Sequence, residues 1–405
     1  MSRSVPGCTT ATQTGPQLRA SAAAMTTLVP MPPGGVSPGP FGVAVTANGN
    51  WGFASSLPIA TAAPVAVAGP GSSPSPVPTP TPSASHGDDS GLDVLRLAPG
   101  RAPVLVHAIA VPGPTAGDTL SQNGRLLLVA GGAGAVVVSV PAAERGSRRS
   151  VLGTLVAPGE PMADVAGEAA ITPDGRYAFV SLQGAGRIAV FNLARAMAHG
   201  FSAAGVYVGS IPAHDAIGLA VSPDGRWLYA TTLKSGVSYP VPAGQLSVIS
   251  IARAESDPPK SVLARVPAGC TPVRVITSAD GSVVWVAATE SNALLAFSAS
   301  RLTTDPAHAL LAAVRVGNAP IGAALAREGT LVLVADSDRF TAGFPPGNIA
   351  VVNVADALAG RPALVGYIPA GRFPRSVAAS GNGALVLVAN FASGQVEAVN
   401  PAVLP

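Results

Sequence analysis

A turn that ends in glycine recurs seven times along this 405-residue chain and constrains its fold more than any other feature. Each turn lies between two short apolar stretches, and the seven turns are Asn48-Gly49, Asn123-Gly124, Asp174-Gly175, Asp224-Gly225, Asp280-Gly281, Glu328-Gly329 and Asn382-Gly383. Asn-Gly or Asp-Gly between apolar runs is the strongest short-range signal of a β-hairpin, since both residues tolerate positive φ. The sequence therefore predicts seven copies of one β unit.

The residues that follow each turn keep the same register. A large side chain stands five residues after the first turn residue in every unit and a small one two residues later, as in Tyr229 and Thr231. A third apolar run then follows, and in several units a fourth, as in 244–249 and 262–269. Four short strands per unit of about 50 residues are typical of a propeller blade. We therefore predict an all-β, seven-bladed β-propeller of four-stranded antiparallel blades.

The last unit has only three runs, and its missing fourth run lies at the other end of the sequence. Residues 27–34, TLVPMPPG, resemble residues 364–371, LVGYIPAG, which form the fourth run of the sixth unit. We expect an N-terminal strand, with Leu28 to Met31 at its centre, to complete the blade built from Ser376 to Val399. Such closure of the ring removes two exposed sheet edges.

Composition excludes several classes of protein. Apolar residues make up 48% of the chain and charged residues 11%, so the chain is not disordered throughout. Its apolar runs are too short to span a bilayer, and we expect no transmembrane segment. The predicted domains are a disordered leader or remnant of an export region over 1–25 and the propeller over 26–405. A Pro/Ser-rich stretch with six prolines over about 69–86 is expected to be a disordered insertion.

The sequence contains few features that would indicate a metal, a cofactor, nucleic acid or an export signal. The two cysteines, Cys8 and Cys270, form neither a disulfide framework nor a metal-ligand set, and we expect no metal and no cofactor. The net charge of +3 is spread along the chain without an aromatic-lined basic stripe, which argues against nucleic acid. Small residues at 22–24 resemble an export cleavage site but lack the preceding apolar core. We expect an extracytoplasmic monomer that is secreted or held at the cell surface, with any export signal upstream.

Several stretches resemble a known repeat. The segments 222–226, SPDGR, and 227–231, WLYAT, resemble YVTN-type β-propeller repeats, as do 387–390, LVAN, and 394–399, GQVEAV. The chain is also similar to the lactonase-like seven-bladed propellers. The resemblance covers residues 26–405 and implies the fold. Function does not follow from it, because this architecture serves binding proteins, scaffolds and enzymes.

Departures from the repeat mark the candidate site. Six residues before each turn, on the strand expected to line the channel, stand Gly42, Gly117, Glu168, Gly218, Arg274, Gly322 and Ser376. Glu168 and Arg274 break the rule of small residues. They are expected either to form an ion pair across the channel or to offer a charged site to a ligand.

Further candidates lie near the expected channel mouth. His214, Asp215, Arg372 and Arg375 precede inner strands, whereas Thr232, Asp336 and Asn390 end second strands. Three enlarged loops, 56–90, 233–243 and 337–346, are expected to emerge on the same face. Long loops in a compact repeat are more often functional or disordered than architectural.

Two functions remain open at this point. The first is a non-enzymatic binding or interaction module whose partner is a protein or a small polar ligand at the channel mouth, with no catalytic residue assigned. The alternative is a lactonase-like hydrolase of the 6-phosphogluconolactonase type. The resemblance then implies an acid, a histidine and an arginine in the channel, for which Glu168, His214 and Arg375 are the nearest candidates.

Overall fold

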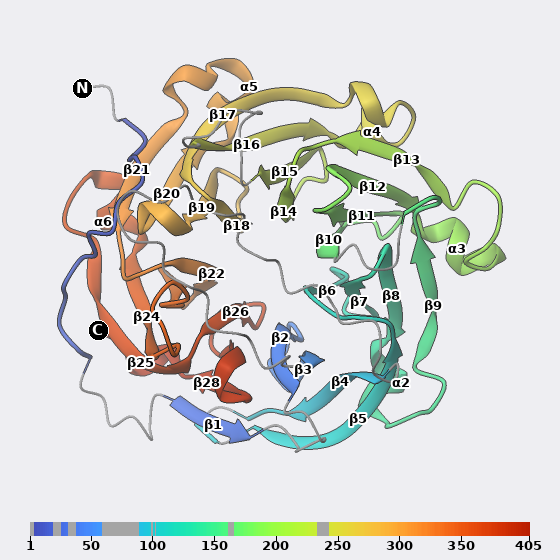
Figure 1. Ribbon diagram of the computed structural model, residues 1–405, viewed down its shortest axis with the longest axis horizontal. Coiled ribbons are helices and arrows are strands. Elements are labelled where there is room, and N and C mark those ends of the chain that lie inside the picture. The colour runs from blue at the N-terminus through green and yellow to red at the C-terminus, as the bar shows by residue number, and fades with distance from the viewer. Residues whose placement is uncertain are drawn as a thin grey trace.

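The computed structural model consists of seven four-stranded antiparallel sheets arranged as blades around a ring (Figure 1). It describes residues 4–18, 26–30, 38–58, 89–98, 100–101, 103–160, 166–232 and 243–405. The predicted all-β, seven-bladed propeller is confirmed. The proline-rich stretch over 69–86 and the loop over 233–242 lie outside the described residues.

The blades follow one another in chain order. Blade 1 contains β2 (Pro38–Val45), β3 (Trp51–Pro58), β4 (Asp89–Arg96) and β5 (Val104–Pro112). Blade 2 contains β6 (Asp118–Leu120), β7 (Leu126–Gly131), β8 (Gly134–Ser139) and β9 (Val151–Val156). Blade 3 contains β10 (Ala166–Ile171), β11 (Tyr177–Leu182), β12 (Arg187–Asn192) and β13 (Tyr207–Pro212). Blade 4 contains β14 (Ala216–Val221), β15 (Trp227–Thr232), β16 (Ala243–Ser250) and β17 (Val262–Cys270).

The second half of the ring repeats this plan. Blade 5 contains β18 (Pro272–Thr277), β19 (Val283–Ala288), β20 (Ala293–Ser298) and β21 (Leu310–Arg315). Blade 6 contains β22 (Pro320–Ala326), β23 (Leu331–Asp336), β24 (Pro346–Asn353) and β25 (Leu364–Arg372). Blade 7 contains β26 (Pro374–Ala379), β27 (Val386–Asn390), β28 (Gln395–Val399) and β1 (Thr26–Pro30).

The N-terminal strand closes the ring as predicted. β1 pairs antiparallel with β28, with Leu28 opposite Glu397 and Pro30 opposite Gln395 (Figure 1). Met31 lies outside the described residues. Blade 7 is thus built from both ends of the sequence, and β28 is paired on both sides.

Short helices join the third strand to the fourth in five blades, which the repeat pattern did not predict. They are α2 (Val140–Glu144), α3 (Leu193–His199), α4 (Ile251–Ala254), α5 (Ala299–Thr304) and α6 (Val354–Ala359). A Ser or Asn side chain caps the N-terminus of each helix by accepting a backbone N–H, as Asn192 does from Arg195. Single-turn 3-10 helices also occur: η1 (Pro258–Lys260), η2 (Thr289–Ser291), η3 (Pro306–His308), η4 (Phe391–Ser393) and η5 (Pro401–Val403).

The hairpin turns differ in detail from the predicted two-residue form. The N–H of Gly49 donates to the carbonyl of Thr46, and Gly49 takes a φ of 70°, whereas Asn48 is not left-handed. The Asn48 side chain accepts from the Thr46 hydroxyl and from the N–H of Asn50. This is a longer turn closed by a left-handed glycine, and an Asn or Asp before it stabilises the turn through side-chain hydrogen bonds.

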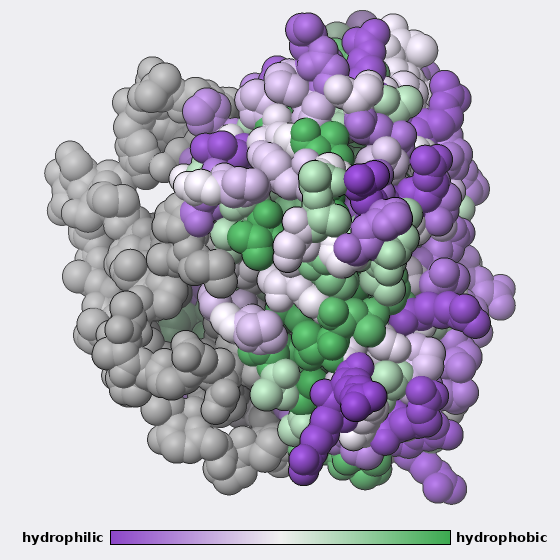
Figure 2. Space-filling model, turned by 90° about the vertical axis from the view of Figure 1, so that its right-hand side faces the viewer, coloured by the Kyte–Doolittle hydropathy of each residue, from purple (hydrophilic) through white to green (hydrophobic). Residues whose placement is uncertain are grey.

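The core consists of apolar layers between neighbouring blades. The large residue five positions after each turn is buried there, and Phe53, Phe179, Tyr229 and Trp285 are at most 1% exposed. Tyr229 of blade 4, for example, packs against Val275 and Val286 of blade 5. Apolar side chains also reach the surface, where Leu152 and Val156 of β9 and Met197 of α3 are exposed. Figure 2 shows apolar surface among polar residues on the side of the ring that lies at the right of Figure 1.

The N-terminal segment differs from the predicted disordered leader over residues 4–18. Cys8 is joined to Cys270 at the end of blade 4 by a disulfide, so the expectation of no disulfide was wrong. The N–H groups of Thr9 and Gln13 donate to the carbonyls of Glu290 and Val316, and Leu18 donates to Tyr367 of blade 6. These contacts satisfy backbone groups that a free leader would leave to water. Sequence spacing alone could not indicate that two cysteines so far apart would meet.

Candidate functional site

The first strand of every blade lines a central channel. In each blade the residue six positions before the turn lies at the same height along this channel, which we call the channel level. Glycine is required there by close approach between neighbouring blades. A Cβ on Gly42 would lie 2.3 Å from the carbonyl oxygen of Ala116, and one on Gly218 would lie 2.2 Å from that of Val273. Small residues at this level are therefore explained by packing between blades.

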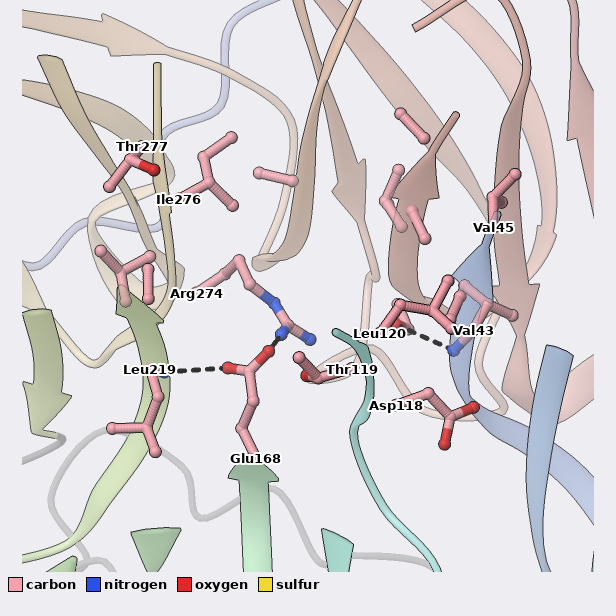
Figure 3. A pocket seen from close by; sticks show the side chains of 18 residues that line it. Val43, Val45, Asp118, Thr119, Leu120, Glu168, Leu219, Arg274, Ile276 and Thr277 are labelled. Carbon is pink, nitrogen blue, oxygen red and sulfur yellow. Dashed lines mark hydrogen bonds and ion pairs between the residues drawn. The ribbon is translucent and has the colours of Figure 1, made fainter. Parts of the chain in front are cut away.

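Glu168 and Arg274 form an ion pair across this level, from β10 of blade 3 and β18 of blade 5 (Figure 3). The second oxygen of Glu168 accepts the backbone N–H of Leu219 at 3.0 Å, and Glu168 is 8% exposed. Burial lowers the pKa of Arg274 to about 10, which leaves the guanidinium charged at neutral pH. The predicted pairing is confirmed, and both carboxylate oxygens of Glu168 are engaged.

A cavity of about 360 Å³ lies beside this ion pair. All seven first strands contribute to its wall, which extends from the level of Glu168 and Arg274 towards the hairpin turns. Twelve of its eighteen lining residues are apolar, but polar atoms form the larger part of the accessible wall. The lining residues are Val43, Ala44, Val45, Asp118, Thr119, Leu120, Glu168, Leu219, Ala220, Arg274, Val275, Ile276, Thr277, Ala323, Ser376, Val377, Ala378 and Ala379 (Figure 3). Convergent polar groups in a concave site are typical of small-molecule sites. The cavity lies on the side of the hairpin turns, which we call the turn face, whereas the enlarged loops belong to the opposite loop face.

Asp118 is a polar residue of this wall that the sequence analysis did not select. Its Oδ2 accepts the N–H of Ser55 at 3.0 Å, and its Oδ1 is buried without a partner among the described residues. Burial raises the pKa of Asp118 to about 7. The sequence contained a signal for Asp118, because it stands five residues before its turn and the equivalent residue of every other blade is apolar. These residues are Val43, Ala169, Leu219, Val275, Ala323 and Val377.

His214 does not join Glu168. It is exposed, and its Nδ1 lies 3.6 Å from where a Cβ of Gly186 would be, in the loop between the second and third strands of blade 3. Asp215 follows with a φ of 48°, a left-handed conformation that Asp tolerates. These two residues therefore form a turn on the loop face beside blade 3.

The three residues that end second strands lie inside the blades. Thr232 is 5% exposed, and Asp336 accepts the N–H of Gly317 at 3.1 Å. Asn390 donates to Glu397 at 2.8 Å. Burial raises the pKa of Asp336 well above its usual value and that of Glu397 to about 7. Their side chains form hydrogen bonds with neighbouring strands and loops, and none of the three lines the cavity.

The two remaining arginines belong to the loop face. Arg372 is exposed, and its Nε donates to the carbonyl of Phe344, so it fastens the enlarged loop 337–346 to β25, the outer strand of the same blade. Arg375 stacks on Phe41, with Cζ 3.5 Å from the ring centroid. Burial and the neighbouring guanidinium groups of Arg339 and Arg274 lower the pKa of Arg375.

Glu168, His214 and Arg375 are thus not arranged as one catalytic set. Glu168 is occupied by Arg274 and Leu219, His214 is an exposed residue on the loop face, and Arg375 lies against an aromatic ring. Among the described residues, no group of three His, Cys, Asp or Glu side chains could hold a metal ion. In the same part of the chain, no helix is long and apolar enough to cross a membrane.

Comparisons with known proteins identify the fold and nothing finer. No protein-family model matches the sequence, and a search of curated proteins finds no match. Among solved structures, hydrazine synthase of Kuenenia stuttgartiensis is similar, with a TM-score of 0.63 and 17% sequence identity over 90% of this chain and 96% of that chain. The chain therefore has a β-propeller fold that it shares with hydrazine synthase at low sequence identity.

Proposed function

We propose that this protein is a non-enzymatic, extracytoplasmic β-propeller of the YVTN type that acts as a binding module. The observation that carries the proposal is the turn-face cavity, to which all seven blades contribute and in which Glu168 is already paired with Arg274. A concave pocket with convergent polar groups is suited to holding a small polar molecule.

The arrangement of Glu168 favours binding over catalysis. A general base needs a lone pair that can reach the proton it removes. The Glu168 carboxylate accepts from Arg274 on one oxygen and from Leu219 on the other. A carboxylate held in this way is a fixed acceptor, and Arg274 beside it is a fixed donor, so together they would orient a ligand with complementary polar groups.

The disulfide supports a location outside the cytoplasm. Cys8 and Cys270 are 5.3 Å apart between Cα atoms and joined by a bond that reducing compartments do not maintain. The loop face, which carries the enlarged loop 337–346, is the surface proposed for a protein partner. We propose a monomer for the unbound protein.

A ligand screen tests the binding proposal. Thermal unfolding is measured with panels of free sugars, aldonic acids and amino acids, and hits are titrated by calorimetry. We expect at least one class to bind wild type and to bind Thr277→Ile, which narrows the cavity and removes a hydroxyl from its wall, about tenfold or more weakly. Arg361→Gln, a change in a surface ion pair with Asp356, serves as the control and should bind as wild type does. Equal binding by wild type and Thr277→Ile would contradict the cavity as the site.

A lactonase-like hydrolase of the 6-phosphogluconolactonase type remains the alternative function. The observation in its favour is Asp118, a buried carboxyl in the cavity wall whose pKa lies near neutrality, as general bases require. Its unpaired Oδ1 is buried, so a water molecule would have to enter the wall to reach it. Turnover of sugar lactones would distinguish the two functions.

A further inference from the structure

A second layer of side chains lies towards the loop end of the channel. It consists of the residues seven positions before the turns, among them Phe41, Ile217, Val273, Ile321 and Arg375. Val273 and Ile321 pack with Phe373, and Ile217, Phe344 and Phe391 pack against this cluster. None of these residues lines the turn-face cavity. The layer therefore lies between that cavity and the loop face.

Two guanidinium groups are held in this aromatic layer. Arg375 stacks on Phe41 at 3.5 Å and lies 5.8 Å from the ring centroid of Phe373. Arg339, from the enlarged loop of blade 6, lies 5.9 Å from the same Phe373 ring. Contact with an aromatic face fixes a guanidinium while leaving the N–H groups at its edge available. Both arginine side chains are partly exposed.

The positive charge in this layer is only partly balanced by the described part of the chain, since burial lowers the pKa of Arg339 while Glu290 raises it. Glu168 pairs with Arg274, and no ion pair to a described carboxylate is made by Arg339 or Arg375. Burial and the two neighbouring arginines lower the pKa of Arg375, as expected for cations crowded in an apolar layer. An uncompensated cation in such surroundings is costly, and a bound anion would relieve that cost.

The ring of Phe373 is held by its neighbours. Its φ of 52° belongs to the repeat, because the equivalent residues of blades 4, 5 and 6, Asp215, Thr271 and Ala319, are also left-handed. Phe344 stacks on Phe373 with ring centroids 5.4 Å apart, and Phe391 meets it edge-on at 5.5 Å. Arg372 in turn holds the carbonyl of Phe344 at 2.8 Å. These contacts fix the ring that both guanidinium groups share.

We propose that Arg375 and Arg339 form a binding site for an oxyanion, a carboxylate or a phosphate, at the loop end of the channel. Guanidinium groups recognise both anions through paired N–H donors. Phe41 and Phe373 hold the arginines, and Arg372 positions the loop that brings Arg339 to the site. This site lies in the layer itself, neither arginine lines the turn-face cavity, and the proposal does not depend on ligand binding there.

Titration with simple anions tests the site. Wild type, Arg375→Met, Arg339→Met and the control Arg226→Met are titrated with sodium phosphate and, separately, sodium acetate, against sodium chloride at equal ionic strength. Arg226 also stacks on an aromatic ring, Trp227 at 5.3 Å, but it is exposed beside a hairpin turn. Binding is followed by calorimetry and by the midpoint of thermal unfolding. The two arms distinguish phosphate from carboxylate.

We expect at least one anion to bind wild type and Arg226→Met saturably and the two layer variants about tenfold or more weakly. Identical responses to all three salts, or wild-type affinity in Arg375→Met, would overturn the proposal.

Discussion

Cys8 and Cys270 are joined by a disulfide between the N-terminal segment and the end of the outer strand of blade 4. From there the segment continues to blade 6, where Gln17 forms a parallel bridge with Tyr367 and the Tyr367 hydroxyl donates to the carbonyl of Gln13. The chain then supplies β1 to blade 7. The first 30 residues thus bind blades 4 to 7 together.

Reduction of the disulfide is expected to destabilise the propeller. The bond closes a loop of 262 positions, and removing a long-loop disulfide costs about 2–5 kcal/mol of unfolding free energy. Urea unfolding with and without reductant measures the loss. The variant Cys8→Ala/Cys270→Ala should unfold at the midpoint of the reduced protein and should not respond to reductant. An unchanged midpoint after complete reduction would contradict the structural role of this bond.

Truncation separates the contributions of the N-terminal segment. Removing residues 1–20 deletes the disulfide and the hydrogen bonds to Glu290, Val316 and Tyr367, so the unfolding midpoint should fall. The disordered leader expected from the sequence over 1–25 would have left the midpoint unchanged. Removing residues 1–34 also deletes β1 and exposes the edge of β28, so the midpoint should fall further and the protein should self-associate at lower concentration. Equal midpoints for the two truncations would show that β1 adds nothing to closure.

Substitution of the channel-level glycines tests the packing between blades. A methyl group on Gly218 would meet the backbone of Val273 at 2.2 Å, so Gly218→Ala should destabilise the protein by about 3 kcal/mol. Gly91→Ala is the matched control, since a Cβ there meets nothing within 4 Å. The control should be neutral or slightly stabilising, because alanine narrows the unfolded ensemble. Chemical denaturation of the two variants compares them directly.

Buried carboxyl groups should make stability depend on pH. Burial raises the pKa of Asp118 and Glu397 to about 7 and that of Asp93 to about 6. A raised folded-state pKa stabilises the protein fully below the unfolded pKa of about 4, and that stability is lost as pH rises through the folded pKa. The unfolding free energy should therefore fall between pH 4 and pH 7, with Asp118 accounting for about 3–4 kcal/mol at most.

Asp118→Asn isolates this contribution because asparagine stays neutral. The variant should lose less stability than wild type between pH 4 and pH 7, measured by urea unfolding at each pH. Glu328→Gln, which alters an exposed carboxylate in a turn, should follow the wild-type profile. Parallel profiles for wild type and Asp118→Asn would show that Asp118 is ionised in the folded protein at all these pH values.

The parts of the structure that depend on repetition were predictable. Seven turns in one register determine seven blades, and the incomplete seventh unit with the similar segment at 27–34 indicates the closing strand. The ion pair of Glu168 and Arg274 was also predictable, because both residues break the same small-residue position. Packing explains that rule: the glycines allow neighbouring blades to approach.

Features that depend on non-repeating contacts were not predictable. The Cys8–Cys270 bond joins residues whose proximity only the folded ring determines. The cavity was expected beside the enlarged loops, but the apolar layer that includes Ile217, Val273 and Ile321 separates it from that face. Asn390 and Asp336 were selected as site residues because they end second strands. Side chains alternate between the two faces of a strand, however, and these two are buried inside the blades.

The assay of wild type and Glu168→Gln on a panel of sugar lactones tests the central claim most directly. The claim is that the ion pair of Glu168 and Arg274 forms part of a binding wall and performs no catalysis. We expect neither protein to hydrolyse any lactone above the uncatalysed rate. Hydrolysis by wild type would contradict the binding module. Its loss in Glu168→Gln, with the variant still folded by circular dichroism, would make Glu168 the catalytic carboxylate, whereas its persistence would point to Asp118.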